Sequence, residues 1–576
     1  MLNLDDYLIG VTSGSESGAC LFFKEKLVAA VSEERFSRKK NDSTFPFHSI
    51  NWLIKEFNLK KKFPFKICFG FTNGLDKRCN IYDLLVKSYN DSILDTNNLS
   101  IISNRFQTEN YIDSKKFSEF KEKIKNIFPN ALLNFYHHHD AHRACSFYSG
   151  FENFYALTCD GRGDGLSLTL SKFIKNENFQ EIYHAYHFQS LGYFYGRMTH
   201  LCGFTANRHE GKVTGLSAKG NPYKAIDLVN KMINFKNGKI FSNLGDYFLP
   251  YFSSYSKKLL IEAKKYSKED LAAAAQFKLE EIVISLIKYY TKKENSFNLC
   301  VSGGVFANVR LNQKLKELKK VNNFFVFPNM SDGGISVGAC YEYLRLKSHN
   351  FKKNIDNKSI FTKKIKCNMY LGPNINVDQL VSTAKKYNKT FLRYSESDLI
   401  DCVIDLLLDN KLIALCYGRS EFGPRALGHR SLIALPSDKD IPKKINNSLG
   451  RDNFMPLAPV MIDEVASKVI KKFKYEDPTS PFMVSTFDAK KILKKTSPAI
   501  VHSDNTCRVQ IVKEEHNPFL FKLLKRLYYE KNVHCLINTS FNMHEEPIVG
   551  NEISIFNTFM KSKINALISP PYIFSN

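Results

Sequence analysis

The chain has 576 residues, which is too long for a single hydrophobic core, so two or more domains are expected. Its 43% hydrophobic and 24% charged residues are typical of a globular protein and exclude a disordered chain. The N-terminus lacks a basic signal region, and no apolar run reaches the ~18 residues of a membrane span, so we predict a cytoplasmic protein with no membrane partner. The 13 cysteines form no C-x-x-C pair, so we expect them to be reduced.

The formal net charge is +25. Nucleic acid, an anionic surface or small phosphorylated substrates would each suit such a charge. The excess comes from short, isolated lysine runs among many asparagines, which is typical of a solvated lysine surface. Dedicated nucleic-acid binding is therefore not expected.

The first elements in chain order are three β-rich runs, YLIGVTSG, ACLFFKEK and LVAAVSEERF, which predict three strands joined by tight turns. The charged, Asn-rich segment 85–130 predicts a helical insertion. A helix is expected from Lys268, because Ser267 can cap it and apolar residues recur after it at helical spacing.

A strand, NLCVSGG, then enters a glycine turn and a second helix, ANVRLNQKLKEL. The polar stretch 347–366 has no apolar periodicity and predicts a domain boundary. Segments that alternate between strand and helix continue to the end, and no internal repeat of fixed period is visible. The pattern predicts an α/β protein.

The motif HHHDAHRACSF places His138 and His142 four residues apart. On a helix they project from one face, one turn apart, and neutral imidazoles so placed suit a transition metal. Two surface histidines are the plainer alternative. His137 and His139 point elsewhere on such a helix and are expected to be bystanders.

Two acidic turns can complete a metal site. CDGRGDG places Asp160 after the apolar strand FYALT, and SDGGISVG places Asp332 beside two glycines. Each aspartate alone is commonly just a turn former. Together with the histidines they predict a site of two His and two Asp.

Phosphate-binding turns accompany this site. SGGVFAN places Gly303 and Gly304 between a strand and a helix, where free backbone N–H groups meet a helix N-terminus. In HEGKVTGLSAKG, Lys212 follows Gly211, although an ordinary loop lysine is the simpler alternative there. A metal, a glycine turn and a lysine in one half of the chain indicate nucleotide chemistry.

The stretch EFGPRALGHRS sets Arg425 and Arg430 around a Gly-Pro turn and a glycine hinge. Fixed guanidinium groups on such a turn suit a phosphate or a carboxylate. A turn whose arginines face solvent is the alternative.

A series of motifs in one order resembles the O-carbamoyltransferase family, which includes the nodulation, tobramycin, cephamycin and ansamycin enzymes. The resemblance runs from about residue 8 to about residue 555. The motifs are ACLFFKEKLVAAVSEERFSRKKND, HHHDAH, CDGRGDG, EGKVTGLSAKG, SGGVFAN, SDGGISVGA, EFGPRALGHRS, TCRVQ and NTSFN.

The resemblance implies an actin-like domain that binds metal and nucleotide over residues 1–350, a linker over 351–367, and a YrdC-like α+β domain over 368–576. It implies that carbamoyl phosphate and ATP, with Mg²⁺, form carbamoyl-AMP in the C-terminal domain. In the actin-like domain a hydroxyl of a small metabolite, sugar or antibiotic-like acceptor then takes the carbamoyl group. The oligomeric state stays open, with a homodimer as one option.

Residue roles carry over by motif. The resemblance implies that Fe²⁺ or another divalent transition metal is held by His138, His142, Asp160 and Asp332. Gly211, Lys212, Gly303, Gly304 and Asn308 match positions around the nucleotide. Arg425 and Arg508, the latter in TCRVQ, match the carbamoyl phosphate pocket, and Arg430 lies beside them; Lys212, Arg425 and Arg508 are the candidate catalytic residues.

The chain departs from the family pattern at several positions. Ser15 stands where relatives have the histidine that assists the acceptor, so Glu16 or His139 is the candidate base. In SLGRDNFMPLAP a lysine is missing at Gly450 and an arginine is replaced by Met455, and His544 replaces another arginine. Each charge-assisted contact contributes about 1.5 to 3 kcal/mol, so Arg425 and Arg508 should carry an unusually large share of anion binding.

Two other functions remain. The charge favours a tRNA threonylcarbamoyl-type enzyme, although the C-terminal motifs and the lack of an RNA-binding motif do not. A non-catalytic descendant that still binds nucleotide would agree with the missing cations, whereas the intact metal and glycine motifs argue against it.

Overall fold

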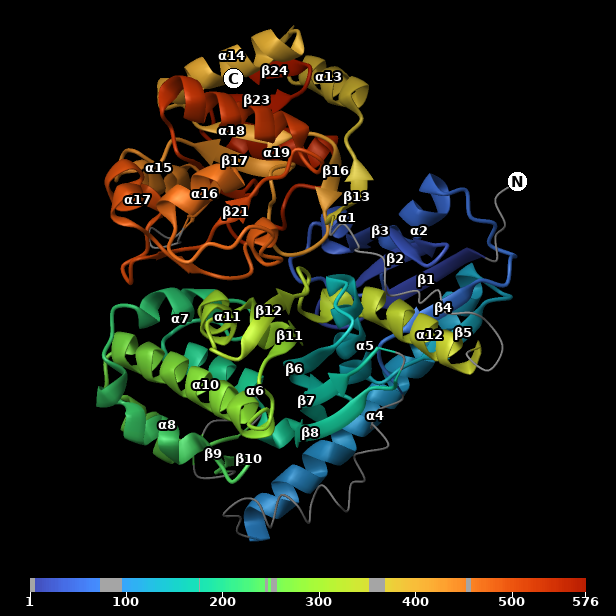
Figure 1. Cartoon of the computed structure of the whole chain (residues 1–576). Helices are drawn as coiled ribbons and strands as arrows, with labels where there is room; N and C mark the ends of the chain where they lie inside the picture. Colours follow the sequence, from blue (N-terminus) through green and yellow to red (C-terminus); the bar gives the residue numbers. More distant parts are fainter. Residues whose placement is uncertain are drawn as a thin grey trace. The chain divides into compact units, whose positions relative to one another are not determined.

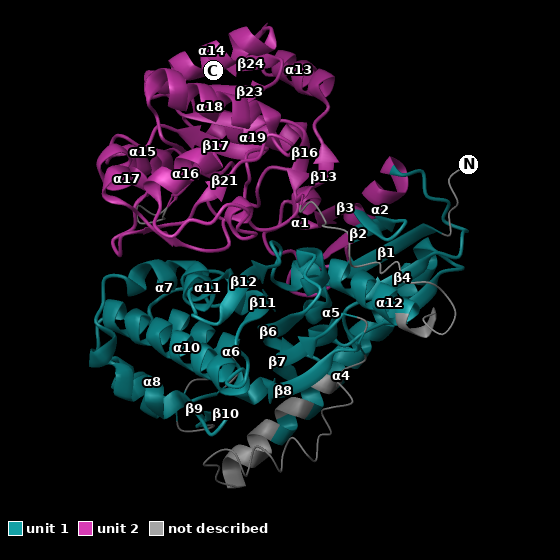
Figure 2. Cartoon of the chain, in the orientation of Figure 1, with its two compact units in different colours: residues 1–12, 20–27, 57–366 teal, residues 13–19, 28–56, 367–576 magenta. Residues whose placement is uncertain are grey.

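The computed structural model describes residues 6–72, 96–175, 177–243, 247–249, 256–351, 368–451 and 457–575. Both halves of the chain combine helices with sheets, which confirms the predicted α/β class (Figure 1). The chain divides into two compact units (Figure 2). Unit 1 contains residues 1–12, 20–27 and 57–366, and unit 2 contains residues 13–19, 28–56 and 367–576.

The first sheet contains the three N-terminal strands that the sequence predicts, so that prediction is confirmed. Its five strands have the spatial order β3 (Lys26–Ser32), β2 (Gly18–Phe23), β1 (Tyr7–Thr12), β4 (Lys66–Phe69) and β5 (Leu132–Phe135). Strand β4 runs parallel to both β1 and β5.

The second sheet also has five strands, in the spatial order β12 (Val321–Val326), β11 (Phe297–Ser302), β6 (Phe154–Gly163), β7 (Leu166–Phe173) and β8 (Gln180–Tyr186). Strands β6, β11 and β12 are parallel, whereas β7 pairs with β6 and β8 in antiparallel fashion. Counted along the chain, both sheets follow the order third, second, first, fourth, fifth. The structure therefore contains a repeat of topology that leaves no fixed period in the sequence.

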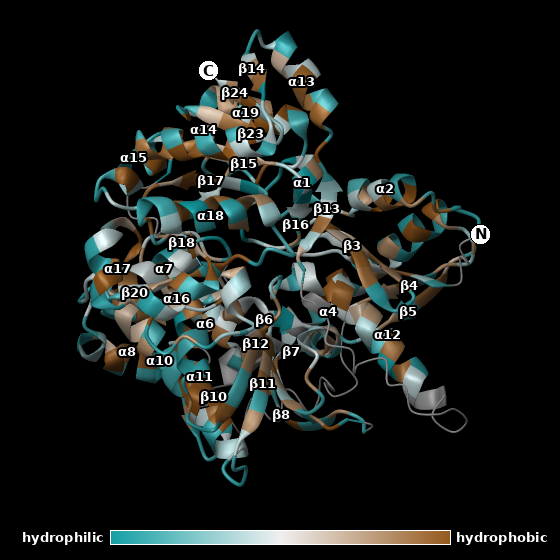
Figure 3. Ribbon diagram, turned by 45° about the horizontal axis from the view of Figure 1, so that its top comes forward, coloured by the Kyte–Doolittle hydropathy of each residue, from teal (hydrophilic) through white to brown (hydrophobic). Residues whose placement is uncertain are grey.

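Apolar side chains explain how these sheets pack. Strand β1 is buried along its whole length, as expected where both faces of a sheet are covered. Helix α12 (Ile335–Phe351) packs against β1 and β4. A Cβ atom at Gly10 of β1 would lie 2.0 Å from the carbonyl oxygen of Ser336, so glycine permits this close crossing. Figure 3 shows the hydrophobic residues along strands such as β3 and β12.

The predicted helix from Lys268 is confirmed as α10 (Lys268–Tyr290), and Ser267 caps it by accepting the N–H of Asp270. The predicted insertion contains α4 (Thr96–Ile127), and its residues 85–95 lie outside the described part of the chain. The other helices and the small hairpin of this half are α5 (His138–Ala144), α6 (Leu191–Leu201), α7 (Glu210–Ser217), α8 (Ile226–Met232), α9 (Lys257–Ala263), α11 (Val309–Lys316), β9 (Ile233–Lys236) and β10 (Lys239–Ser242), with 3₁₀ turns η2 (Cys145–Ser149), η3 (His187–Gln189), η4 (Pro222–Lys224), η5 (Gly304–Ala307) and η6 (Asp332–Gly334).

Unit 2 is built on a mixed sheet of eight strands, in the spatial order β14 (Thr390–Arg393), β24 (Tyr572–Ser575), β23 (Ala566–Ser569), β15 (Ile413–Cys416), β17 (Arg430–Ala434), β22 (Leu536–Ser540), β18 (Ala458–Met461) and β21 (Gln510–Ile511). The neighbours β15 and β23 are parallel, and so are β18 and β21. Most residues of the predicted linker, 352–367, lie outside the described residues.

Helices cover this sheet and supply its core together with β15, β17 and β22. They are α13 (Val377–Lys386), α14 (Glu396–Leu408), α15 (Ile441–Ser448), α16 (Asp463–Val469), α17 (Lys491–Thr496), α18 (Pro518–Lys531) and α19 (Glu552–Lys561). The N-terminal segments add α1 (Glu34–Ser37) and α2 (Phe47–Glu56), and short elements complete the unit: β13 (Tyr370–Asn374), β16 (Arg419–Glu421), β19 (Phe487–Asp488), β20 (Thr506–Cys507), η7 (Ser480–Phe482) and η8 (Pro498–Ile500). Among the described helices, none is long and apolar enough to cross a membrane.

Candidate metal centre and anion pocket

Three candidate positions of unit 1 lie where the parallel pairing of neighbouring strands ends. Asp160 lies just beyond the last residue of β6 that pairs with β11, Gly303 follows β11, and Asp332 begins η6 after β12. The carboxyl ends of parallel strands meet at one edge of a sheet, where ligands commonly bind. The order of the strands therefore brings both predicted carboxylates and the predicted glycine turn to the same edge of the sheet.

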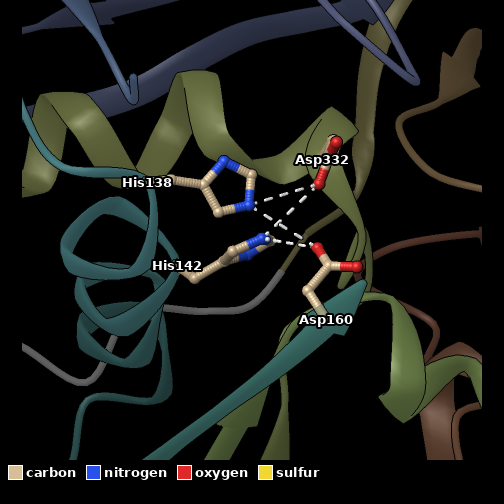
Figure 4. A group of neighbouring side chains, drawn as sticks. All are labelled: His138, His142, Asp160 and Asp332. Carbon is tan, nitrogen blue, oxygen red and sulfur yellow. Dashed lines mark hydrogen bonds and ion pairs between the residues drawn. The ribbon is translucent and has the colours of Figure 1, made fainter. Parts of the chain in front are cut away.

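The predicted helix that carries both histidines is confirmed as α5. The imidazole of His138 is 7% exposed and that of His142 is fully buried. Both rings point toward Asp160 and Asp332 (Figure 4). The structure thus brings together all four residues that the sequence proposes as metal ligands.

The four side chains lie close enough to share one ion, because their nearest ligand atoms are all within 4.8 Å of one another. Nε2 of His142 lies 3.1 Å from Oδ2 of Asp160 and 3.6 Å from Oδ1 of Asp332. Nε2 of His138 lies 3.6 Å from each of the same two oxygens.

Two observations fit a bound cation. Nε2 of His138 and Oδ1 of Asp332 are buried and have no hydrogen-bond partner in the described structure. Nδ1 of His142 lies 3.2 Å from the hydroxyl of Ser302, which orients the ring so that Nε2 faces the carboxylates. Two imidazole nitrogens and two carboxylate oxygens form a donor set typical of divalent transition metals.

The electrostatics of the group also favour added positive charge. Burial lowers the pKa of His142, but the nearby carboxylates of Asp160 and Asp332 outweigh burial and raise that pKa to about 9. Burial raises the pKa of Asp160, yet its interactions with the imidazoles of His138 and His142 hold it well below its usual range. Two carboxylates that meet at one point favour a positive charge beside them.

Residues at the turn between β6 and β7 contact the first residue of helix α5. Asp164 accepts the backbone N–H of His138 at 2.9 Å. A Cβ atom at Gly163 would lie 2.0 Å from the His138 ring, so this position requires glycine. These two contacts fix the position of His138 at the start of α5.

His139, one of the two predicted bystanders, is only 1% exposed and its Nδ1 lies 2.8 Å from the hydroxyl of Thr158. Burial, together with the charges of His138 and His142, holds the pKa of His139 well below its usual range. The ring of His139 is therefore neutral and shielded from solvent.

The predicted glycine turn lies directly beside the carboxylates. Gly303 has φ 109°, and a Cβ atom there would lie 2.2 Å from the carbonyl oxygen of Cys159. A Cβ atom at Gly304 would lie 3.1 Å from Oδ1 of Asp160. Asn308 caps α11 by accepting the N–H of Leu311.

Lys212 is half-exposed on α7, and its ammonium group lies 5.7 Å from the centre of the Phe204 ring. Gly211 and Gly215 lie on the same helix, and a Cβ atom at either one would meet no atom within 4 Å. Glycine inside a helix costs about 1 kcal/mol relative to alanine. Two such glycines facing open space leave room for a ligand to approach the backbone.

A buried hydrogen-bond network connects α7 with the glycine turn. The hydroxyl of Tyr195 donates to Oε1 of Gln276 at 2.8 Å and lies 2.9 Å from the hydroxyl of Thr214 on α7. Nδ2 of Asn308 donates to the same Oε1 at 2.7 Å. Gln276 therefore fixes the position of Asn308 relative to α7 through Tyr195.

In unit 2, the structure places Arg425 and Arg508 near each other and half-buried. Burial lowers the pKa of Arg425, and burial together with the charge of Arg425 holds the pKa of Arg508 well below its usual range. Nε of each guanidinium is buried without a hydrogen-bond partner, and no carboxylate among the described residues pairs with either. Two adjacent cations without a counter-ion are suited to binding an anion.

Arg430 has different surroundings from Arg425 and Arg508. Its side chain is fully buried, and its terminal nitrogens donate to the backbone carbonyls of Tyr417, His429, Pro373 and Gly418. These contacts hold the turn that carries Arg425. In place of the predicted contact with a ligand, they indicate a structural role for Arg430.

Sequence reasoning missed Arg451, which lies in the quoted motif SLGRDNFMPLAP but received no role. Its guanidinium donates to the hydroxyl of Thr539 at 2.8 Å and to the carbonyl of Ser540 at 2.6 Å. Burial lowers the pKa of Arg451 to about 10. The arginine of the motif SLGRDNFMPLAP was the signal that could have identified Arg451 as a candidate.

Two of the departures from the family pattern lie side by side. The N–H of His544 donates to the carbonyl of Leu449 at 2.8 Å, next to Gly450. A Cβ atom at Gly450 would lie 4.0 Å from that of His544. Met455 lies outside the described residues.

The chain is similar to known proteins along most of its length. Residues 8–341 match the model of the carbamoyltransferase N-terminus, and residues 404–576 match that of the carbamoyltransferase C-terminus. A protein of Methanocaldococcus jannaschii is 31% identical, and the match covers 99% of each chain. Nodulation protein NolNO of Sinorhizobium fredii is 27% identical over 96% of this chain and 78% of its own. Nodulation protein NolO of Bradyrhizobium diazoefficiens is 27% identical over 76% of this chain and 78% of its own.

These matches define a transferase whose chain forms two compact units. The chain belongs to the carbamoyltransferase family, and the prediction of an O-carbamoyltransferase from its motifs is confirmed.

Proposed function

We propose that this enzyme uses ATP and carbamoyl phosphate to form carbamoyl-AMP and transfers the carbamoyl group to a hydroxyl of a small metabolite, sugar or antibiotic-like acceptor. The observation that carries the proposal is the pair Arg425 and Arg508, which lie together without a carboxylate partner. A phosphorylated donor would supply the missing negative charge, and each charge-assisted contact contributes about 1.5 to 3 kcal/mol.

The first reaction belongs to unit 2 in this proposal. Water releases phosphate from carbamoyl phosphate, and the resulting carbamate oxygen attacks the α-phosphorus of ATP, so that diphosphate leaves with its Mg²⁺. Arg425 and Arg508 bind the anionic donor and offset the charge that accumulates on the departing phosphate groups. Arg451 holds the end of β22 through its contacts with Thr539 and Ser540.

The second reaction belongs to unit 1. The acceptor hydroxyl attacks the carbamoyl carbon, its proton passes to a base, and the bond from that carbon to the AMP oxygen breaks. Because His139 is buried and neutral, it is a poor candidate for that base. The glycine turn at Gly303 and Gly304 and the ammonium group of Lys212 would bind the phosphate of the nucleotide.

His138, His142, Asp160 and Asp332 would hold the metal, which we propose to be Fe²⁺ or another divalent transition metal. Once bound, the metal would polarise the mixed anhydride and stabilise negative charge on the leaving AMP. The buried, unpartnered Nε2 of His138 and Oδ1 of Asp332 support this assignment.

The repeated strand order of the two five-stranded sheets supports an actin-like architecture for unit 1, as the resemblance implies. We propose that unit 2 is the YrdC-like half that forms the adenylate. The use of ATP and carbamoyl phosphate as co-substrates supports a cytoplasmic location.

The direct test is mass spectrometry for carbamoyl-AMP after incubation of the purified chain with ATP, carbamoyl phosphate and Fe²⁺. Formation of the adenylate with release of diphosphate is the expected result. No adenylate, with ATP still bound, would favour the non-catalytic nucleotide-binding alternative. A shift of labelled tRNA that weakens steeply with salt would favour the threonylcarbamoyl alternative, for which the net charge of +25 is the supporting observation.

Replacing Gly215 by alanine should separate stability from nucleotide binding. The substitution should raise the free energy of unfolding by about 1 kcal/mol, because alanine favours the helix and the new Cβ atom meets nothing within 4 Å. It should weaken ATP binding by about tenfold if the nucleotide packs on this face of α7. Denaturant unfolding without ligand and calorimetry with ATP measure the two effects, and unchanged ATP affinity would show that this face of the helix is free of nucleotide.

A further inference from the structure

The loop that carries Arg425 joins β16 to β17 and depends on external anchors. Gly423 has φ 138° and Gly428 has φ 111°, both in the region that residues with side chains rarely adopt. Such a loop has no internal ladder of hydrogen bonds to fix the direction of the Arg425 side chain. Its orientation must come from residues that hold the loop on either side of Arg425.

Glu421 holds the loop on the side after Arg425. One carboxylate oxygen, Oε1, accepts the backbone N–H groups of Leu427 at 2.7 Å, His429 at 2.9 Å and Arg430 at 3.1 Å. The side chain is 3% exposed, so these bonds are shielded from water. Three bonds to one buried carboxylate fix this part of the loop.

Arg35, from the N-terminal part of the chain, holds the loop on the side before Arg425. Its Nη2 donates to the carbonyl oxygen of Gly423 at 2.8 Å, two residues from Arg425, and this bond is buried. The Arg35 side chain is 3% exposed, and its Nη1 pairs with Glu34 at 2.8 Å. The anchor is rigid because charge, burial and geometry all fix the guanidinium group.

Helix α1 and the residue after it contact residues 547–550 of unit 2. Arg38 donates to the carbonyl oxygens of Pro547 and Ile548, both at 2.7 Å. A Cβ atom at Gly550 would lie 2.1 Å from the carbonyl oxygen of Arg35, so the two backbones touch. The stretch on which α1 rests follows Asn542, whose side-chain oxygen accepts a hydrogen bond from Arg451 at 3.0 Å.

We propose that Arg35 is a positioning residue of the anion pocket. It sets the direction of Arg425 through Gly423, so an N-terminal segment is an integral part of the donor site of the C-terminal half. The identity of the donor rests on the function proposed above, whereas the role of Arg35 concerns the binding of any phosphate group by Arg425 and Arg508.

The test uses full-length Arg35→Met and Arg35→Lys with two probes, inorganic phosphate and carbamoyl phosphate, whose binding is followed by calorimetry. Arg35→Met keeps the length of the side chain but cannot donate to Gly423, so binding of both probes should weaken by about tenfold. Arg35→Lys should recover part of that loss, because an ammonium group can still donate one hydrogen bond. In the diphosphate-release assay, KM for carbamoyl phosphate should rise more than kcat falls.

Arg345→Met is the matched control. Arg345 is another buried arginine, in unit 1, and it donates to Glu342 at 2.8 Å and to Asn178 at 2.9 Å. Its loss should reduce stability comparably and leave phosphate binding unchanged. Wild-type affinity for phosphate in folded Arg35→Met would overturn the proposal.

The outcomes also separate this inference from the proposed function. A wild-type chain that binds phosphate but never consumes carbamoyl phosphate would contradict the proposed donor and leave the Arg35 test intact. A wild-type chain that binds neither probe would show that Arg425 and Arg508 form no anion pocket, and the role of Arg35 would then be wrong as well.

Discussion

Replacing His142 by alanine should abolish metal binding and acceptor transfer while diphosphate release continues. The substitution removes a fully buried ligand and leaves Asp160 and Asp332 facing each other with His138 as the remaining imidazole. Loss of a residue that merely orients a ligand costs about 10- to 100-fold in metal affinity, so loss of the ligand itself should exceed that range. Metal analysis of the purified variant, with separate assays of the two half-reactions, measures the effect.

His142→Ala can also unfold the protein, because breaking a buried charge pair costs about 3 to 5 kcal/mol. His142→Gln preserves most of the volume and supplies a second variant with the same expectation. His139→Gln is the matched control, since His139 lies on the same helix and is buried, but its Nδ1 lies beside Thr158. Full metal occupancy in His142→Ala, or loss of metal in His139→Gln, would show that the ligand set is wrong.

Replacing Arg425 by methionine should abolish donor-dependent diphosphate release and yet make the fold more stable. Burial and the charge of Arg425 hold the pKa of Arg508 well below its usual range, and no described carboxylate offsets the two charges. Removing one charge relieves this repulsion, so the free energy of unfolding should rise by on the order of 1 kcal/mol. Denaturant unfolding and a diphosphate-release assay measure the two changes on the same variant.

Arg430→Met is the contrasting variant. Arg430 donates to four backbone carbonyls, which this substitution leaves buried and unpaired. Each unsatisfied buried group costs about 1 to 3 kcal/mol, so this variant should be much less stable than the wild type. If Arg425→Met keeps normal diphosphate release, the turn that carries it is structural and the proposed donor pocket is wrong.

The features that the sequence predicted correctly are those that neighbouring residues determine. Ser267 caps α10 because its side chain reaches a backbone N–H three residues later. The two histidines of α5 share a face because four residues span about one turn of a helix. The motif order identified the family because each motif retains its own short pattern of glycines and charged residues.

Other features depended on contacts between distant parts of the chain. Arg425 and Arg430 look alike in the sequence, but in the structure Nε of Arg425 has no hydrogen-bond partner, whereas the terminal nitrogens of Arg430 donate to backbone carbonyls. The repeat of strand order leaves no period in the sequence, because insertions such as α4 separate equivalent strands and the side chains of the two halves differ. Residues 28–56 belong to unit 2, although in the sequence they lie between β2 and β4 of the first sheet.

The sequence by itself determined the family, the α/β class and the identity of the four candidate metal ligands, because local spacing and turn chemistry specify these features. Only the tertiary structure decided that Asp160 and Asp332 meet the histidines, since parallel pairing of β6, β11 and β12 brings their carboxyl ends to one edge. Only the tertiary structure joined Arg35 to Gly423, a contact between residues 388 positions apart. A hydrogen bond across that distance depends on the packing of a whole unit, and no local pattern of residues encodes it.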